Sequence, residues 1–420
     1  MTPLLGCIGD DFTGSTDLAG MLVREGLRTV QMIGVPGGAP PRDVDAIVVA
    51  LKSRTTPPRE AIAESLGALR WLQRAGCSRF YFKYCSTFDS TDRGNIGPVT
   101  DALMTELGTG FTIACPAFPE NKRTIFKGYL FAGDVLLSES GMQHHPLTPM
   151  TDPNLVRVLQ RQTRRRVGLV AYDVVGSSAQ AVRERFQKLQ ADGVEIAIVD
   201  ATSNDDLVRI GEACLDLALV TAGSGVALGL ARALRAPARG VAGAASLPRV
   251  EGLRAILSGS CSVATQAQVA FALEHGVPGF RVDPMKLAAG DDVVGAALAW
   301  AAPIVERGPV LVYATAAPEA VKTVQAKLGA ELAGQLVERA IAGIGRGLVD
   351  RGVRQLIVAG GETAGAVVND LGVTGLWIGP QIDPGVPWTV SLGAVPLALA
   401  LKSGNFGTTD FFVKAWGVLP

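Results

Sequence analysis

This sequence lacks the residues and motifs that mark several common classes of protein. Its 420 residues include only three histidines, and its six cysteines stand singly with no Cys-x-x-Cys pair, so a histidine- or cysteine-based metal centre is not expected. The dipeptide Gly-Lys is absent, which excludes a P-loop. The 39 basic side chains balance the 39 acidic ones, so neither nucleic acid nor an anionic membrane surface is an expected partner.

These absences also indicate the cellular compartment of the protein. Single cysteines in a long chain are typical of reduced, buried thiols in the cytosol, and the N-terminus has no basic region before its apolar stretch. The longest charge-free run, residues 384–401, contains three prolines, which disfavour a membrane-spanning helix. We therefore expect a cytoplasmic protein that does not span a membrane.

Apolar runs of strand length alternate with helix-like segments along the whole chain. Strands are expected at 4–8, 45–51, 79–85, 111–116, 167–172, 195–200 and 217–221, and then at 253–258, 278–282, 309–314, 354–359 and 374–378. The Ala-, Gly- and Pro-rich segment 236–250 separates the two series, and 379–400 is expected to form turns with short edge strands. This pattern predicts an α/β fold of two α/β domains, residues 1–240 and 251–420, with largely parallel sheets and an interdomain active-site cleft.

Charged side chains stand where several strands of the first half are expected to end. They are Asp10, Asp11, Arg54, Lys83 and Asp89. Residues 13–15, Thr-Gly-Ser, follow the acidic pair and are expected to cap the next helix. Carboxyl ends of parallel strands share one sheet edge, so these groups suit a small ligand that carries carboxylate and hydroxyl groups. The alternative is an internal salt-bridge network that closes the sheet edge.

A short glycine-rich turn follows the expected strand 217–221. Gly223 and Ser224 precede Gly225 and a helix, an arrangement that offers free backbone N–H groups to an anion. The spacing over 223–229 loosely resembles a dinucleotide-binding pattern, but only arginines carry charge from 230 to 250, and the expected acidic residue is missing. A nicotinamide cofactor is therefore disfavoured.

Three Gly- and Ser-rich turns stand out in the second half. They are residues 257–262, 359–365 and 401–407, and each could hold phosphates through backbone N–H groups. Glu362 lies inside the second turn, where a carboxylate can position Mg²⁺ directly or through water, and Lys402 adds a charge to the third. The alternative for each is an ordinary tight turn between strand and helix.

Together these motifs resemble the four-carbon acid sugar kinases over essentially the whole chain. The resemblance is carried by residues 10–14, 81–91, 94–103, 141–152, 223–231, 257–262, 358–365, 378–388 and 400–407. It implies an N-terminal domain that binds an acid sugar and a C-terminal domain that binds a nucleotide. Within the family the likeness is to the members that use ATP to phosphorylate the 4-hydroxyl of 3-oxo-tetronate.

The resemblance also assigns roles to individual residues. Nucleotide contacts fall on Ser258, Gly360, Gly361, Glu362, Thr363 and Gly404, with Mg²⁺ at Glu362 and the phosphates of ATP over the turns. Substrate contacts fall on Arg54, Lys83, Asp89, Gly223 and Ser224, and Asp10 or Asp11 accepts the proton of the attacking hydroxyl. The chain departs from the family pattern at Gly9 and Ser15, where alanine is usual, and at Ala364, where serine is usual.

Two other functions stay open at this point. One is a kinase for D-threonate or another unoxidised tetronate, and the other is a sensor that binds the nucleotide or the acid sugar without catalysis. The expected partners are a small acid sugar and ATP, and the sequence is compatible with a homodimer.

Overall fold

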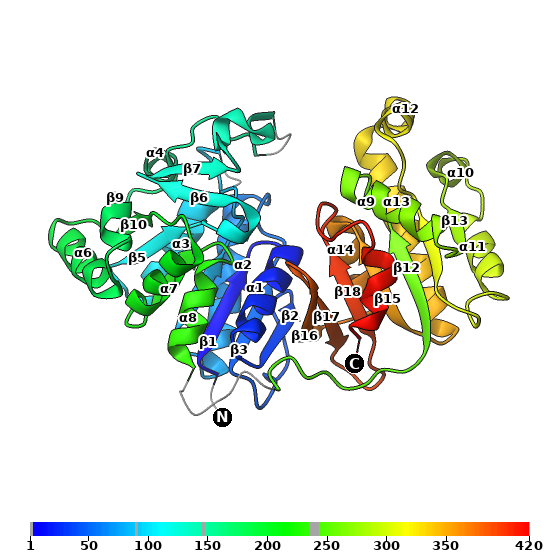
Figure 1. Ribbon diagram of the computed structural model, residues 1–420, viewed down its shortest axis with the longest axis horizontal. Coiled ribbons are helices and arrows are strands. Elements are labelled where there is room, and N and C mark those ends of the chain that lie inside the picture. The colour runs from blue at the N-terminus through cyan, green and yellow to red at the C-terminus, as the bar shows by residue number, and fades with distance from the viewer. Residues whose placement is uncertain (1–2, 89–90, 145–147, 236–242, 420) are drawn as a thin grey trace. The chain divides into compact units, whose positions relative to one another are not determined.

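A computed structural model describes residues 3–88, 91–144, 148–235 and 243–419 of the chain (Figure 1). The chain divides into an N-terminal unit, Met1–Ala245, and a C-terminal unit, Ser246–Pro420. This division falls inside the predicted linker 236–250, of which 236–242 lies outside the described residues.

The main sheet of the N-terminal unit is parallel throughout. Its strands are β1 (Leu5–Gly9), β2 (Thr29–Ile33), β3 (Ala46–Ala50), β4 (Phe80–Lys83), β5 (Thr112–Cys115), β9 (Val167–Val170), β10 (Ile196–Val199) and β11 (Leu219–Ala222). They lie in the order β2-β3-β1-β4-β11-β5-β10-β9. Every residue of β1 and β3 is buried, as expected for strands with helices on both faces.

Helices connect these strands. They are α1 (Phe12–Arg24), α2 (Pro58–Arg74), α3 (Ile96–Leu107), α4 (Leu155–Gln162), α5 (Tyr172–Val175), α6 (Ala179–Ala191), α7 (Asn204–Ala213) and α8 (Val226–Leu234). Helices α1, α8 and α7 pack in one row, and α2, α3 and α4 pack in another. A small antiparallel sheet of β6 (Arg123–Phe126), β7 (Tyr129–Ala132) and β8 (Val135–Leu136) was not anticipated from the sequence.

The C-terminal unit repeats the α/β plan with a mixed sheet. Its strands are β12 (Leu253–Ser258), β13 (Gly279–Arg281), β14 (Val310–Tyr313), β15 (Val353–Ala359), β16 (Gly375–Asp383), β17 (Val386–Ser391) and β18 (Ala398–Lys402). They follow the order β13-β14-β12-β15-β18-β17-β16, parallel from β13 to β18 and antiparallel at β17 and β16. The helices are α9 (Val263–Glu274), α10 (Pro284–Ala288), α11 (Val293–Ala301), α12 (Pro318–Leu328), α13 (Ala330–Asp350), α14 (Gly361–Asp370) and α15 (Phe411–Lys414).

The segment 379–400 corrects one expectation. It contributes β17, which pairs with β16 and β18, and β18, which pairs with β15 and β17, so neither is an edge strand. All six residues of β17 are buried, and Trp388 at its centre donates from its indole to the carbonyl of Ala415 at 2.8 Å. Residues 379–400 form no helix, as their prolines predict, but the prolines do not prevent these residues from pairing within a sheet. No helix among the described residues has the length and apolarity needed to cross a membrane.

Chain connections place a topological switch point in each unit. From β1 the chain crosses by α1 to β2, whereas from the neighbouring β4 it crosses by α3 to β5 on the other side. In the C-terminal unit β12 leads by α9 to β13, whereas the neighbouring β15 leads by α14 towards β16. Because parallel crossovers are right-handed, the two helices at each point lie on opposite faces, and ligands bind where such neighbours diverge. The predicted α/β class is thus confirmed, and it directs attention to residues after β1 and β4 and after β12 and β15.

Candidate functional site

The acidic pair lies at the carboxyl end of β1, at the switch point of the N-terminal unit. Asp10 follows the strand, and its backbone N–H donates to the carbonyl of Lys83 at 3.0 Å. Asp11 is the N-cap of α1: its Oδ2 accepts from the backbone N–H of Gly14 and from the hydroxyl of Thr13, both at 3.1 Å. The helix therefore begins at Phe12, earlier than the expected cap at 13–15, because a carboxylate satisfies its free N–H groups.

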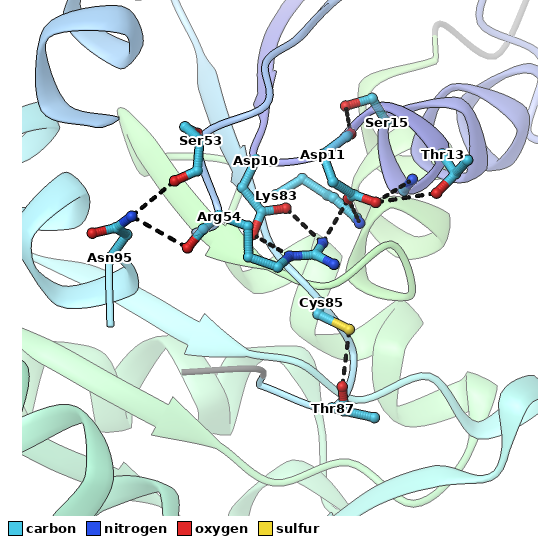
Figure 2. A network of polar contacts seen from close by, with 11 residues as sticks. Asp10, Asp11, Thr13, Ser15, Ser53, Arg54, Lys83, Cys85, Thr87 and Asn95 are labelled. Atoms are coloured by element: carbon cyan, nitrogen blue, oxygen red, sulfur yellow. Dashed lines mark hydrogen bonds and ion pairs between the residues drawn. The ribbon is translucent and has the colours of Figure 1, made fainter. Parts of the chain in front are cut away.

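Arg54 joins the two carboxylates. Its Nε and one terminal nitrogen donate to the two oxygens of Asp10 at 2.9 and 2.8 Å, a bidentate pair, and the same terminal nitrogen donates to Oδ1 of Asp11 at 2.6 Å. The Nζ of Lys83, at the end of β4, lies 3.2 Å from that Oδ1. Figure 2 shows the four side chains as one cluster built from three neighbouring strand ends.

The loop that carries Arg54 is fixed by backbone contacts. The N–H groups of Ser53 and Arg54 donate to the carbonyl of Asp10 at 2.9 and 3.1 Å. The side-chain amide of buried Asn95 donates to the carbonyls of Ser53 and Arg54 at 2.8 and 3.2 Å (Figure 2). It also donates to the carbonyl of Thr56 at 2.9 Å. Asn95 was not singled out from the sequence, since an isolated amide before a helix carries no signal of such contacts.

Burial and the ion pairs move the two carboxylates in opposite directions. Burial raises the pKa of Asp10, and this outweighs the opposing effect of Arg54. Burial also acts to raise the pKa of Asp11, but Lys83, Arg54 and the Gly14 N–H outweigh it and hold that pKa well below its usual range. The pKa of Lys83 is raised, because its carboxylate neighbours Asp11 and Asp10 overcome the lowering effect of burial. Paired carboxylates with separated pKa values are typical of sites where one group accepts a proton.

Gly14 permits the approach of Lys83 to the helix. A Cβ placed on Gly14 would lie 1.7 Å from Nζ of Lys83 and 2.3 Å from Oδ1 of Asp11. The next helical position on this face, Asp17, is only 7% exposed, and its Oδ1 has no hydrogen-bond partner among the described residues. Burial raises the pKa of Asp17, while a hydrogen bond to Ser224 and the charge of Lys83 oppose that rise. The spacing of three residues from Asp11 to Gly14 to Asp17 places all three on one face, and this spacing is visible in the sequence.

Three other residues are predicted to contact the substrate: Gly223, Ser224 and Asp89. Gly223 and Ser224 follow β11, which pairs with β4, and Ser224 is buried against Asp17 on α1. A Cβ on Gly223 would lie 3.0 Å from the carbonyl of Pro116, so this turn is tightly packed. Asp89 lies outside the described residues.

In the C-terminal unit the three predicted turns lie side by side. They follow β12, β15 and β18, which are neighbours in the sheet, with Ser258 opposite Ala359 and Ala359 opposite Lys402. Backbone N–H groups of Gly259 and Ser260 donate to the carbonyl of Ala359 at 3.1 and 3.3 Å. The hydroxyls of Ser262, the N-cap of α9, and Thr265 donate to the carbonyl of Gly404 at 2.6 and 2.7 Å. The turns thus form one hydrogen-bonded group.

Glycine is required where these turns touch. A Cβ on Gly259 would lie 2.2 Å from Oγ1 of Thr363, and one on Gly404 would lie 2.4 Å from Oγ of Ser260. Gly360 has φ +121°, a conformation that side chains rarely adopt. Ser258 itself is fully buried, and its hydroxyl contacts that of Thr315 at 2.8 Å, so its side chain lies behind the turn.

A pocket of about 790 Å³ opens beside two of the turns. One side is formed by Gly259, Ser260 and residues 360–363. The rest of the lining combines charged residues, among them Arg281, Asp291 and Asp292, with apolar ones. Val293, Val321 and Val337, from α11, α12 and α13, are called the apolar wall. Glycine turns and apolar side chains in one pocket suit a ligand with an anionic end and an apolar end. The wall was not anticipated, because it depends on how three consecutive helices pack around the pocket.

Glu362 lies in the first turn of α14, is exposed, and lines the same pocket. Among the described residues no cluster of three or more His, Cys, Asp or Glu side chains could hold a metal ion. Mg²⁺ in nucleotide sites needs only one or two carboxylates, with phosphate oxygens and water completing its shell. A single carboxylate at the rim therefore fits a magnesium ion that arrives with a nucleotide.

Comparison with known proteins matches both units to described families. Residues 5–230 match a family described as the sugar-binding N-terminal domain, and residues 255–412 match one described as the nucleotide-binding C-terminal domain. Two α/β units with these two binding functions define a sugar kinase class. The chain belongs to the four-carbon acid sugar kinase family, and membership of a kinase family implies the use of ATP.

Individual relatives are similar over nearly their whole length. A Burkholderia multivorans protein named 3-oxo-tetronate kinase is 61% identical over 98% of this chain and 96% of its own. One of the same name from Pseudomonas fluorescens is 61% identical over 99% of this chain and 97% of its own. The crystal structure of a Haemophilus influenzae protein matches with a TM-score of 0.85 and 47% identity, over 99% of this chain and 100% of its own.

Proposed function

We propose that this chain is an ATP-dependent kinase that phosphorylates the 4-hydroxyl of 3-oxo-tetronate. The observation that carries the proposal is the 61% identity, over nearly the full length, to relatives named 3-oxo-tetronate kinase. The two sites support it, since one holds charged side chains suited to an acid sugar and the other holds glycine turns suited to phosphates. No P-loop is needed, because the turn after β15 leads directly into the N-terminus of α14, and helix N-termini hold phosphates through their first backbone N–H groups.

The acid sugar binds at the Asp10–Arg54 cluster in this proposal. Arg54 is the better candidate to hold the substrate carboxylate, since its side chain is 23% exposed whereas that of Lys83 is 5% exposed. Lys83 then holds Asp11 in place, and Gly223, Ser224 and Asp89 stay predicted contacts.

Asp10 is the proposed base for the attacking hydroxyl. A carboxylate has about four acceptor positions. Asp11 uses them on Arg54, Lys83, Gly14 and Thr13. Asp10 accepts one bond from Arg54 at each oxygen, so it keeps capacity for a substrate hydroxyl. Its raised pKa also makes it the stronger base of the two.

ATP binds in the C-terminal unit, with its phosphates over the turns 259–262 and 360–363 and its base against the apolar wall. Gly360, Gly361, Thr363 and Gly404 contact the phosphates, and Ser258 supports them from behind through Thr315. Mg²⁺, held by Glu362, supplies charge neutralisation of the phosphates when bound. Direct transfer requires the hydroxyl to meet the γ-phosphate, and the interdomain active-site cleft stays the prediction for where they meet.

The test is a coupled assay of ADP release over a panel of tetronates and 3-oxo-tetronates, with ³¹P NMR of the product. We expect the highest kcat/KM with 3-oxo-tetronate and a phosphate on the 4-oxygen. Higher kcat/KM with D-threonate would overturn the substrate assignment and leave the kinase. No ADP release with any acid sugar, together with retained binding of ligands, would identify a sensor instead.

Location and assembly are proposed on separate grounds. All six cysteines are free, which favours a reducing compartment, and we propose the cytoplasm. We also propose a homodimer, which sedimentation of the purified chain would test.

A further inference from the structure

The carboxyl end of β18 carries a lysine that the proposed mechanism does not use. Lys402 is fully buried, with 0% of its surface exposed, and it is among the largest side chains in the protein with no contact to solvent. Buried ammonium groups are costly unless a negative charge or hydrogen bonds compensate them. The groups around Lys402 therefore determine how much its burial costs.

The ammonium of Lys402 holds the third turn against the start of α9. Its Nζ donates to Oγ1 of Thr265 at 3.0 Å and to the carbonyl of Gly404 at 3.2 Å. Because Ser262 and Thr265 also donate to that carbonyl, three side chains converge on one acceptor. The carbonyl of Lys402 in turn accepts from the N–H of Gly360 at 2.9 Å, so this residue connects the second and third turns.

No carboxylate among the described residues lies within ion-pair distance of Lys402. The charged or titratable groups on the elements packed around it, and just beyond the turn, are Arg354, Glu274, His275, Glu362, Asp370, Asp383, Asp410 and Lys414. Asp383 and Asp410 pair with Lys414, and Glu274 and Asp370 lie at the far ends of their helices. Burial alone therefore acts on the ammonium and lowers the pKa of Lys402 to about 7.

We propose that Lys402 is a positioning residue of the nucleotide site, which fastens the 403–407 turn to α9 and receives its counter-charge from the phosphates of the bound nucleotide. The inference rests on the proposed function. The phosphate side of the pocket is one layer away, since Ser260 lines the pocket and also lies against Gly404. Where water is excluded, a charge acts on neighbouring groups more strongly than it does in water.

This arrangement couples nucleotide binding to the uptake of a proton. In the free protein about half of the Lys402 side chains are neutral at pH 7. A nearby phosphate raises the pKa of Lys402, so this lysine takes up a proton when the nucleotide binds. The contribution to affinity is therefore complete below about pH 7 and is lost as the pH rises, by up to about tenfold per pH unit.

The experiment is isothermal titration of the full chain with ADP and Mg²⁺ between pH 7 and 9, in paired buffers of different ionisation enthalpy. We expect uptake of about half a proton at pH 7 and close to one at pH 8. Lys402→Met should bind ADP more than tenfold more weakly at pH 7 with no uptake, and Lys402→Arg should bind it without uptake at any pH. Lys322→Met, an exposed lysine on α12, is the matched control and should behave as wild type.

The outcomes separate this inference from the proposed function. Wild-type protein that binds ADP without taking up a proton, or uptake that persists in Lys402→Met, would overturn the role of Lys402 and leave the kinase standing. Absence of ADP binding would overturn the proposed function itself. If circular dichroism shows that Lys402→Met does not fold, the wild type and Lys402→Arg decide the question.

Discussion

The two units place their candidate sites at the same point of similar sheets but build them from different atoms. After β1 and β4 the N-terminal unit presents charged side chains, with Arg54 bridging Asp10 and Asp11. After β12 and β15 the C-terminal unit presents backbone N–H groups, hydroxyls and glycines. Sheet topology explains the position in both cases, because helices diverge on either side of each switch point.

This difference explains how each site would recognise its own ligand. A small acid sugar offers a carboxylate and a few hydroxyls, and paired charged side chains can match each group individually. Phosphates offer many equivalent oxygens, which a row of backbone N–H groups can hold without a fixed side-chain charge. Even the lysine at the C-terminal site, Lys402, lies behind the turns rather than on their surface.

The largest expected effect comes from removing the proposed base. Asp10→Asn should lower kcat by about 10²- to 10⁴-fold, because proton acceptance is lost while size and shape are kept. Steady-state kinetics should show an unchanged KM for ATP, since the change lies in the N-terminal unit. Asp173→Asn removes an exposed carboxylate on α5 and serves as the control. Turnover near the wild-type rate in Asp10→Asn would assign the proton to another group.

A glycine substitution tests the close packing in the charged site. Gly14→Ala would place a Cβ 1.7 Å from the ammonium of Lys83, so this group must move away from Asp11. We expect kcat/KM for the acid sugar to fall about 10- to 100-fold, as misplaced groups at a reacting centre do. Gly67→Ala on α2 is the matched control, because its Cβ would make only ordinary contacts at 3.5 Å. Equal kinetics for the two variants would mean that the position of Lys83 is unimportant.

The equivalent substitution in the glycine site should affect only the nucleotide. Gly404→Ala would place a Cβ 2.4 Å from Oγ of Ser260, and the turn must open to relieve the contact. We expect the KM for ATP to rise about tenfold, which corresponds to about 1.4 kcal/mol, with the KM for the acid sugar unchanged. Gly365→Ala on α14 meets nothing within 4 Å and is the control. A matching rise in the acid-sugar KM would show that the two sites are not separable.

The last prediction concerns the stability of the fold in acid rather than the rate of the reaction. Because the folded pKa of Asp11 is depressed, its ionised form stabilises the fold above its unfolded pKa, and that stabilisation is lost as the pH falls through the folded value. Asp11→Asn should fold but be less stable than wild type by about 1–2 kcal/mol at pH 7. Urea unfolding should show this difference shrinking below about pH 4. A difference that does not change with pH would mean that the charge of Asp11 contributes nothing.

Much of the fold could be predicted because strand and helix patterns are local. The expected strand 4–8 is observed at Leu5–Gly9, and the expected strand 253–258 is observed at Leu253–Ser258. The errors lie where distant contacts decide. Residues 379–400 enter the sheet interior because β18 pairs with β15. The short strands β6, β7 and β8 form a separate antiparallel sheet, in which Ile125 of β6 is bridged to the distant Ala201.

The residue types that end the strands follow from the sequence alone: they are Asp10, Asp11 and Lys83 in the first unit and the glycine turns in the second. The family also follows from the sequence, because those motifs keep their order and composition. Three features are visible only in the folded structure: which carboxylate accepts more hydrogen bonds, which lysine lacks a counter-charge, and which helices form the apolar wall. The reason is physical: burial and charge pairing depend on atoms brought together from distant positions, whereas strand and turn propensities act over a few neighbouring residues.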